Sequence, residues 1–278
     1  MRIDAHQHYW KINRADYGWI TPDIPVLYRD FMVNDLKKHL EENNIDKTIV
    51  VQAAPTIEET EFILDLSTHS TSIAGVVGWV DLEDPTYKEQ LNKFREHPKF
   101  IGIRIMIQDM PDESRILEPH YLEAFAYLEE LDLPIDLLVK ASQLPVLLKL
   151  LNQVSIRGVI DHIAKPNIAK GELEPWKRQI SEIAKHPNIY CKLSGMVTEA
   201  NHNNWRIEEF IPYVHHIIEE FGTNRVMYGS DWPVCLLSAS YNQVYQLLKD
   251  TLPRNITSVE IERIFGANAI EFYQLDKL

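Results

Sequence analysis

Two histidines near the start of the chain have the spacing of a metal-binding pair. His6 and His8 stand two residues apart in Asp4-Ala-His-Gln-His8. On a β-strand, residues two apart point to the same side, so both imidazoles can converge on one point. Two neutral imidazoles there supply half of a divalent-metal site. Such pairs also occur by chance, and it is the position at the end of a predicted strand that favours function.

Two further candidates follow apolar runs later in the chain. His162 ends Arg157-Gly-Val-Ile-Asp-His162, and Lys165 follows three residues on, just before a proline. Asp231 ends Arg225-Val-Met-Tyr-Gly-Ser-Asp231 and precedes Trp-Pro. A lone strand-end histidine is more often structural, and an aspartate here can be the N-cap of a helix. The Trp-Pro that follows makes that cap less convincing, so we predict that both side chains serve the same site.

Two cations interrupt otherwise apolar strands. Arg104 lies in Phe100-Ile-Gly-Ile-Arg-Ile-Met-Ile107, and Lys192 lies in Tyr190-Cys-Lys-Leu-Ser-Gly195. A buried charge must be paired or must face an open cleft, because an unpaired one is costly. Each is therefore either part of a structural salt bridge or, with Lys165, part of a positive cluster that binds an oxygen-rich substrate.

The elements that would position these residues alternate between strands and helices. Eight β-branched, apolar runs read as strands buried on both faces, which is typical of parallel sheets. These runs are Arg2–His8, Lys47–Ala53, Ile73–Asp81, Phe100–Ile107, Pro134–Val139, Arg157–His162, Ile189–Ser194 and Arg225–Asp231. Helical spacing of apolar residues fills gaps between them at Asp35–Asn43, Glu58–Ser70 and Tyr121–Leu131.

Eight strand–helix units favour an α/β fold, a single (β/α)8 barrel over residues 1–278. Long loops follow the first strand (Tyr9–Phe31) and the seventh (Met196–Trp205). Loops after strands lie on the carboxyl face of such barrels, where active sites are found. We therefore expect Trp10, Trp19 and Trp232 to contact the substrate.

Composition excludes several function classes. With 28 Lys and Arg against 41 Asp and Glu, the net charge is −13, which disfavours nucleic-acid and membrane-surface partners. The sequence contains no signal-peptide pattern and no apolar run of membrane-spanning length. Cys191 and Cys235 lie in apolar runs and read as reduced, buried thiols of a cytoplasmic protein. A homo-oligomer is compatible with the sequence, which leaves the oligomeric state open.

Most of the other histidines are expected to be solvated on polar helix faces or at helix ends, without a role in the site. They are His39, His69, His97, His120, His186, His215 and His216.

Taken in order, these residues resemble the amidohydrolase-related metal-dependent hydrolases, and within them the branch of sugar-lactone hydrolases. The resemblance covers nearly the whole chain, and its most specific segments are Leu-Ser-Gly-x-Val-Thr-Glu-Ala and Gly-Ser-Asp-Trp-Pro. The matching stretches are Arg2–His8, Gly75–Leu82, Gly102–Asp109, Ile135–Val139, Asp161–Pro166, Lys192–Ala200, Tyr228–Cys235 and Asn268–Tyr273.

The resemblance implies a (β/α)8 barrel that hydrolyses a cyclic ester. In the wider superfamily a metal is held by the first-strand His-x-His, by histidines of the fifth and sixth strands and by the last-strand aspartate. The matching positions here are His6, His8, His162 and Asp231. The fifth strand, Ile135–Val139, has no histidine, and the fourth offers no lysine for carboxylation. We therefore expect one divalent metal, with Zn²⁺ foremost, while some lactone-hydrolysing relatives work without any metal.

The expected substrate is a small sugar lactone. In this hypothesis Asp231 takes a proton from water, His6, His8 and His162 or their metal polarise the carbonyl, and Arg104, Lys165 or Lys192 stabilise the oxyanion. Two alternatives stay open. One is a metal-dependent decarboxylase of an unsaturated or aromatic acid on the same barrel, and the other is a non-catalytic sugar-acid-binding protein.

Overall fold

Eight parallel strands form the centre of the molecule, in the computed structural model that describes residues 1–275. Each strand pairs with its neighbour in sequence, so the sheet order is β1 to β8 without interruption. The strands are β1 (Ile3–Gln7), β2 (Lys47–Val51), β3 (Ile73–Gly78), β4 (Phe100–Met106), β5 (Ile135–Leu138), β6 (Gly158–Ile160), β7 (Ile189–Leu193) and β8 (Val226–Tyr228). All eight predicted strands are confirmed, and each is shorter than its predicted range.

The first and last strands meet and complete the barrel. Gln7 forms a parallel bridge with Trp232, beyond the end of β8. The backbone N–H of His8 donates to the carbonyl of Trp232 over 2.7 Å, and that of Asp231 donates to the carbonyl of His6 over 2.8 Å. These bonds place the end of β1 against the segment after β8, and the predicted (β/α)8 barrel is confirmed.

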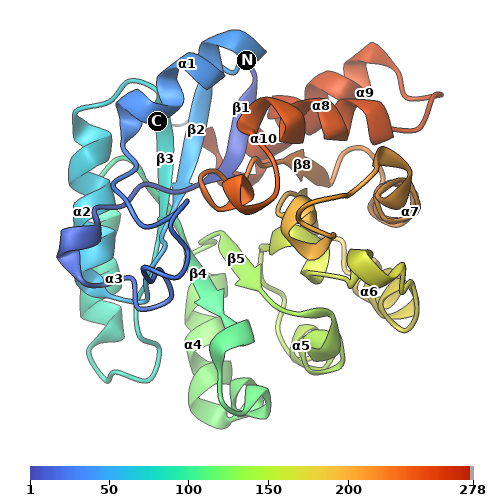
Figure 1. Cartoon of the computed structure of the whole chain (residues 1–278). Helices are drawn as coiled ribbons and strands as arrows, with labels where there is room; N and C mark the ends of the chain where they lie inside the picture. The colour runs from blue at the N-terminus through green and yellow to red at the C-terminus, as the bar shows by residue number, and fades with distance from the viewer. Residues whose placement is uncertain (276–278) are drawn as a thin grey trace.

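Helices surround the strands (Figure 1). Their apolar stripes pack against the outside of the barrel, as Leu36 and Leu40 of α1 do. The helices are α1 (Val33–Asn43), α2 (Ile57–Thr68), α3 (Tyr87–Arg95), α4 (Pro119–Glu130), α5 (Leu144–Leu151), α6 (Trp176–Ala184), α7 (Ile211–Phe221), α8 (Tyr241–Thr251), α9 (Ser258–Glu262) and α10 (Asn268–Tyr273).

The loops after the strands differ strongly in length. The longest joins β1 to α1 over residues 8–32, and its neck is closed by a pair of backbone hydrogen bonds between Trp10 and Phe31, each 3.0 Å. Residues 194–210 join β7 to α7. The connection after β6, residues 161–175, is also long. Three extended loops therefore shape the carboxyl face of the barrel.

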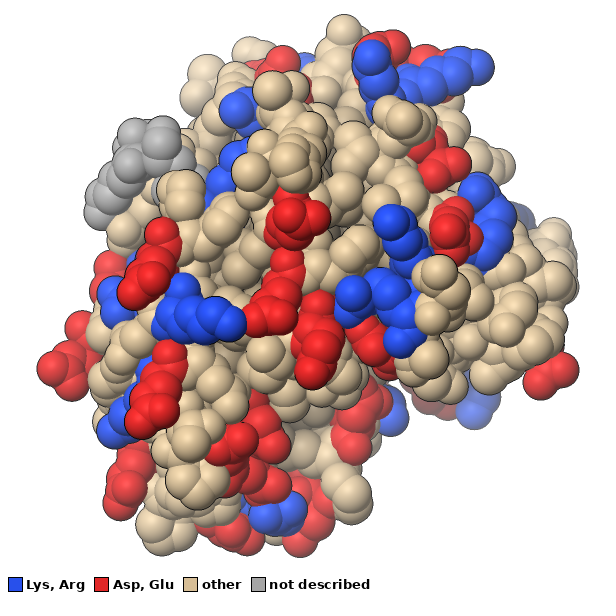
Figure 2. Space-filling model, turned by 90° about the vertical axis from the view of Figure 1, so that its left-hand side faces the viewer, with Lys and Arg blue, Asp and Glu red and all other residues tan. Residues whose placement is uncertain are grey.

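The surface and the cysteines agree with the composition. On the face shown in Figure 2, acidic side chains lie between and around the basic ones. Cys191 and Cys235 are both free and buried, as predicted. Within residues 1–275 no helix combines the length and the hydrophobicity that crossing a bilayer requires.

Candidate active site

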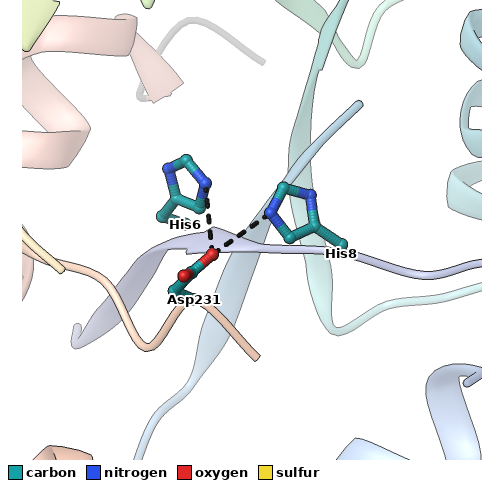
Figure 3. A group of neighbouring side chains, drawn as sticks. All are labelled: His6, His8 and Asp231. Atoms are coloured by element: carbon teal, nitrogen blue, oxygen red, sulfur yellow. Dashed lines mark ion pairs between the residues drawn. The ribbon is translucent and has the colours of Figure 1, made fainter. Parts of the chain in front are cut away.

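Three imidazoles surround one carboxylate oxygen at the carboxyl end of the barrel. The Nε2 atoms of His8, His6 and His162 lie 3.3, 3.8 and 4.0 Å from Oδ1 of Asp231. Figure 3 shows the first two pointing at Asp231 from the end of β1. All four side chains are almost completely buried. The structure thus brings together the four residues that the sequence singled out as ligands.

Unusual backbone conformations aim two of these side chains. Asp231 has a φ of 57° and His162 a φ of 55°, in the left-handed region that residues with a β-carbon seldom adopt. Gly195, itself at a φ of 60°, packs against the His162 ring, and a β-carbon there would collide with it. The glycine of the Leu-Ser-Gly segment is therefore needed for His162 to take its place.

The other nitrogen of each imidazole is held by the surrounding barrel. Nδ1 of His8 lies 2.7 Å from the carbonyl oxygen of Val51, which can only accept, so this nitrogen carries the proton. Nδ1 of His162 lies 2.9 Å from Oγ of Ser194. Nδ1 of His6 lies 3.2 Å from Oδ1 of Asp161. These partners leave Nε2 of each ring available to a ligand.

The ionisation states of His6, His162 and Asp231 favour binding of a cation. Burial lowers the pKa of His162 to about 4, although Asp231 and Asp161 oppose the shift. Burial likewise lowers the pKa of His6 well below its ordinary value. Burial disfavours the ionised form of Asp231, but His162 and His8 more than offset this and hold its pKa below the usual range. At neutral pH the cluster therefore holds an ionised Asp231 beside the neutral imidazoles of His6 and His162.

A divalent metal fits these residues. Nε2 of His6 is buried without a hydrogen-bond partner, and Nε2 of His8 lies 3.3 Å from Oδ1 of Asp231, so both nitrogens face a point at which a cation can bind. The ligand atoms of His6, His8 and Asp231 all lie within 4.8 Å of one another. Imidazole nitrogens with a carboxylate are the donors that Zn²⁺ prefers.

Beneath the histidines lies a group of buried charges, which we name the charged floor: Arg104, Asp136, Asp161 and Lys192. Nζ of Lys192 forms an ion pair with Asp136 and lies 3.1 Å from Oδ1 of Asp161 and 3.2 Å from Nδ1 of His6. Nη1 of Arg104 lies 3.6 Å from Oδ2 of Asp161.

The sequence left open whether Arg104 and Lys192 form structural salt bridges or bind substrate, and both form buried ion pairs in the floor. Lys192 is fully buried, and its ammonium is surrounded by carboxylates and His6. Arg104 is 4% exposed, and its other contacts are the backbone carbonyl and the side-chain oxygen of Gln52. Both belong to buried salt bridges with Asp161, and Lys192 and Asp161 also contact the ring of His6.

The residues expected to contact substrate divide into two groups. Lys165 is half-buried and Trp19 is 41% exposed, so both offer surface to a ligand. Trp10 and Trp232 are 0% and 2% exposed, and their rings pack edge-on against Phe31, with centroids 5.3 Å apart in each case. Because their faces are covered, these two tryptophans support the loop that surrounds the site.

Sequence reasoning missed the acidic half of the floor. Asp136 and Asp161 each interrupt or end an apolar strand, the same signal that singled out Arg104 and Lys192. It also missed Glu59, a fully buried glutamate in the first turn of α2, which carries no comparable signal.

One histidine departs from the expectation of solvation. His216 is 4% exposed, and its Nε2 lies 3.0 Å both from Oγ of Ser181 and from the carbonyl oxygen of Lys177. The prediction was wrong here because α7 turns this residue toward α6, a helix–helix contact that periodicity alone does not identify.

A cavity of about 250 Å³ opens on the same carboxyl face, between the loops after β2, β3 and β4. Pro55, Trp79 and Met106 are part of its lining, whereas the four ligand candidates are not. It adjoins the floor through Gln52, whose Nε2 donates to Sδ of Met106 over 3.0 Å and whose Oε1 accepts from Arg104. The cavity therefore lies on the β2–β4 side of the carboxyl face and is linked to Arg104 of the floor through Gln52.

The barrel and its histidine–aspartate cluster have the architecture of a hydrolase with a candidate metal site. The Amidohydrolase family model matches residues 3–275, and the chain belongs to this family. It is 39% identical to an L-fucono-1,5-lactonase of Burkholderia ambifaria, covering 99% of this chain and 96% of that protein. It is 34% identical, with the same coverages, to an L-fucono-1,5-lactonase of Burkholderia multivorans. A crystal structure of an amidohydrolase from B. multivorans with bound zinc is 33% identical, superposes with a TM-score of 0.94 and covers 99% of both chains.

Proposed function

We propose that this protein is a lactonase that opens a sugar-acid lactone, with L-fucono-1,5-lactone as the first substrate to test. The observation that carries the proposal is the convergence of three imidazole Nε2 atoms on Asp231. The names of the relatives at 39% and 34% identity point to the same ester class.

Asp231 is proposed as the general base. Its carboxylate is ionised at neutral pH, so it can accept a proton from a water molecule as the water oxygen attacks the lactone carbonyl carbon. The ring C–O bond then breaks and the proton on Asp231 passes to the departing oxygen. The new carboxylic acid releases its remaining proton to solvent, so the open-chain product leaves as a carboxylate. Asp231 ends the cycle ionised.

His6, His8 and His162, with Asp231, would hold one divalent metal, for which Zn²⁺ is the best match to the donors. When bound, such an ion supplies a Lewis acid that polarises the lactone carbonyl. The chain itself orients the three rings through Asp161, Val51 and Ser194, each of which contacts a ring nitrogen on the side away from Asp231.

Among the cations, Lys165 is proposed to bind the lactone. It is half-buried, and no hydrogen bond or ion pair engages its ammonium within residues 1–275. Arg104 and Lys192 act one layer below, by fixing Asp161 and His6. Trp19, with its exposed ring, is proposed to cover one face of the sugar ring.

The test is acid release from a panel of sugar lactones, followed with a pH indicator and with purified protein before and after chelation. We expect turnover of the 1,5-lactone, its loss on chelation and its return with Zn²⁺. Turnover that survives complete removal of metal would overturn the metal assignment. Catalysis would then depend on Asp231 and the histidines without a metal. Release of CO2 from an aromatic or unsaturated acid, without any lactone turnover, would instead favour the decarboxylase alternative.

A further inference from the structure

A carboxylate that the proposed hydrolysis does not use lies beside the same site. Glu199 ends the 3₁₀ segment Met196–Glu199 that follows β7. Its side chain is only partly exposed, and it has no hydrogen bond or ion pair within the described part of the chain. Burial raises the pKa of Glu199, while Lys165 opposes the shift and Asp231 adds to it.

Lys165 reaches the same region from the neighbouring strand. It follows β6, and β6 and β7 are adjacent in the sheet. Its φ of 50° turns the chain sharply, and its backbone N–H donates to the carbonyl of His162 over 2.8 Å. The next short segment, Ile168–Lys170, packs against Met196–Glu199, which in turn packs against Val234–Leu237 after Asp231. The two side chains therefore belong to contiguous loops around the base.

An ammonium and a carboxylate in adjacent loops would ordinarily pair, yet Lys165 and Glu199 do not form an ion pair. The other charges acting on Glu199, those of Lys140 and His202, belong to exposed residues. A separated donor and acceptor of opposite charge match a neutral ligand that both donates and accepts hydrogen bonds. Two neighbouring hydroxyl groups on a ring have this property, because one can donate to the carboxylate while the other accepts from the ammonium.

We propose that Glu199 and Lys165 form a diol-recognition subsite, in which Glu199 accepts from one ring hydroxyl of the lactone and Lys165 donates to its neighbour. The subsite would select polyhydroxylated lactones over unsubstituted ones. The inference rests on the proposed lactonase function, since it concerns the substrate of that same site.

The experiment compares kcat/KM for L-fucono-1,5-lactone with kcat/KM for δ-valerolactone, a six-membered lactone without hydroxyl groups. Loss of a hydrogen bond to a charged group corresponds to a factor of about ten or more. We expect Glu199→Gln to lower the preference for the sugar lactone about tenfold, mainly through KM, and Lys165→Met to do the same. Glu208→Gln, the same substitution at an exposed residue of the same loop, is the matched control and should keep the wild-type preference.

The outcomes separate the two proposals. Turnover of both lactones by the wild type, with equal losses in Glu199→Gln, would overturn the subsite and leave the lactonase function standing. Turnover of neither lactone by the wild type would overturn the proposed function and the subsite with it. A selective loss in both Glu199→Gln and Lys165→Met supports the subsite, since a merely structural role would lower both activities together.

Discussion

The charged floor and the first long loop surround the same site but are held in different ways. In the floor, Lys192 is fixed by Asp136, Asp161 and His6, and the hydroxyl of Tyr273 donates to Asp136 over 2.6 Å. These contacts join β1, β5, β7, α10 and the segment after β6. Each group needs the others, because a buried charge without its partner is costly.

The loop is held mainly by aromatic packing. The ring of Trp10 contacts those of Trp19 and Phe31, with centroids 5.6 and 5.3 Å away, and Phe31 contacts Trp232 beside Asp231. Its polar anchor is Glu59, whose carboxylate accepts from the hydroxyl of Tyr17 over 2.5 Å. The floor therefore fixes Nδ1 of His6 to within hydrogen-bond geometry, whereas the loop provides a packed wall that Glu59 attaches to α2.

The largest expected effect is on kcat, when the proposed base above the floor is replaced. Asp231→Asn removes the base but keeps the shape of the side chain, so kcat should fall about 10³-fold or more. Thermal unfolding and zinc content measured on the same preparation are the controls for folding and metal binding. A variant that retains a tenth of the wild-type kcat would contradict the role of Asp231.

The next effect tests the floor itself. Lys192→Met leaves Asp136 and Asp161 without their shared cation, and breaking a buried ion pair typically costs about 3–5 kcal/mol. Urea unfolding should show this loss, and adding Asp136→Asn should recover part of it by removing one unpaired charge. If Lys192→Met unfolds at the wild-type urea concentration, the ion pairs of the floor do not stabilise the protein.

The floor also shows how far sequence reasoning reaches. His6, His8, His162 and Asp231 could be predicted to meet, because parallel strands in one barrel bring their carboxyl ends to a common face. The acidic partners Asp136 and Asp161 also lie in or directly after strands, but their pairing with Lys192 depends on which side chains point into the barrel, and strand order alone does not give this.

The loop could not be predicted in the same way. Residues 8–32 have no periodicity that fixes which side chains face inward, so the burial of Trp10 and the exposure of Trp19 depend on how the loop packs. The same holds for Glu59, whose burial follows from Tyr17 docking on it from a distant part of the sequence.

The two tryptophans of the loop give a matched pair. Trp10→Ala removes a fully buried ring and should cost about 3 kcal/mol of stability, measured by urea unfolding. Trp19→Ala removes a partly exposed ring, so its cost in stability should be smaller while KM for the sugar lactone rises. The reverse pattern, with KM raised by Trp10→Ala alone, would place the substrate against the other ring.

The smallest effect concerns the polar anchor of the loop and its dependence on pH. Burial raises the pKa of Glu59 from 4.5 to about 7, although the Tyr17 hydroxyl and the Ala53 amide lower it in part. Between these values the folded protein holds a proton that the unfolded chain has released, so the contribution to stability is full below pH 4.5 and is lost as the pH rises through 7. The size of this contribution is on the order of 3 kcal/mol.

Glu59→Gln should remove this dependence of the unfolding free energy on pH. Burial also raises the pKa of Asp4 and of Asp136 to about 6. Both residues are present in the wild type and in Glu59→Gln, so their contributions cancel when the unfolding free energies of the two proteins are subtracted. We therefore expect the wild type to lose stability relative to Glu59→Gln as the pH rises. The measurement is the difference between their unfolding free energies from pH 4.5 to 8. A difference that stays constant with pH would mean that Glu59 is ionised throughout, and that the loop, like the floor, is held by a charge.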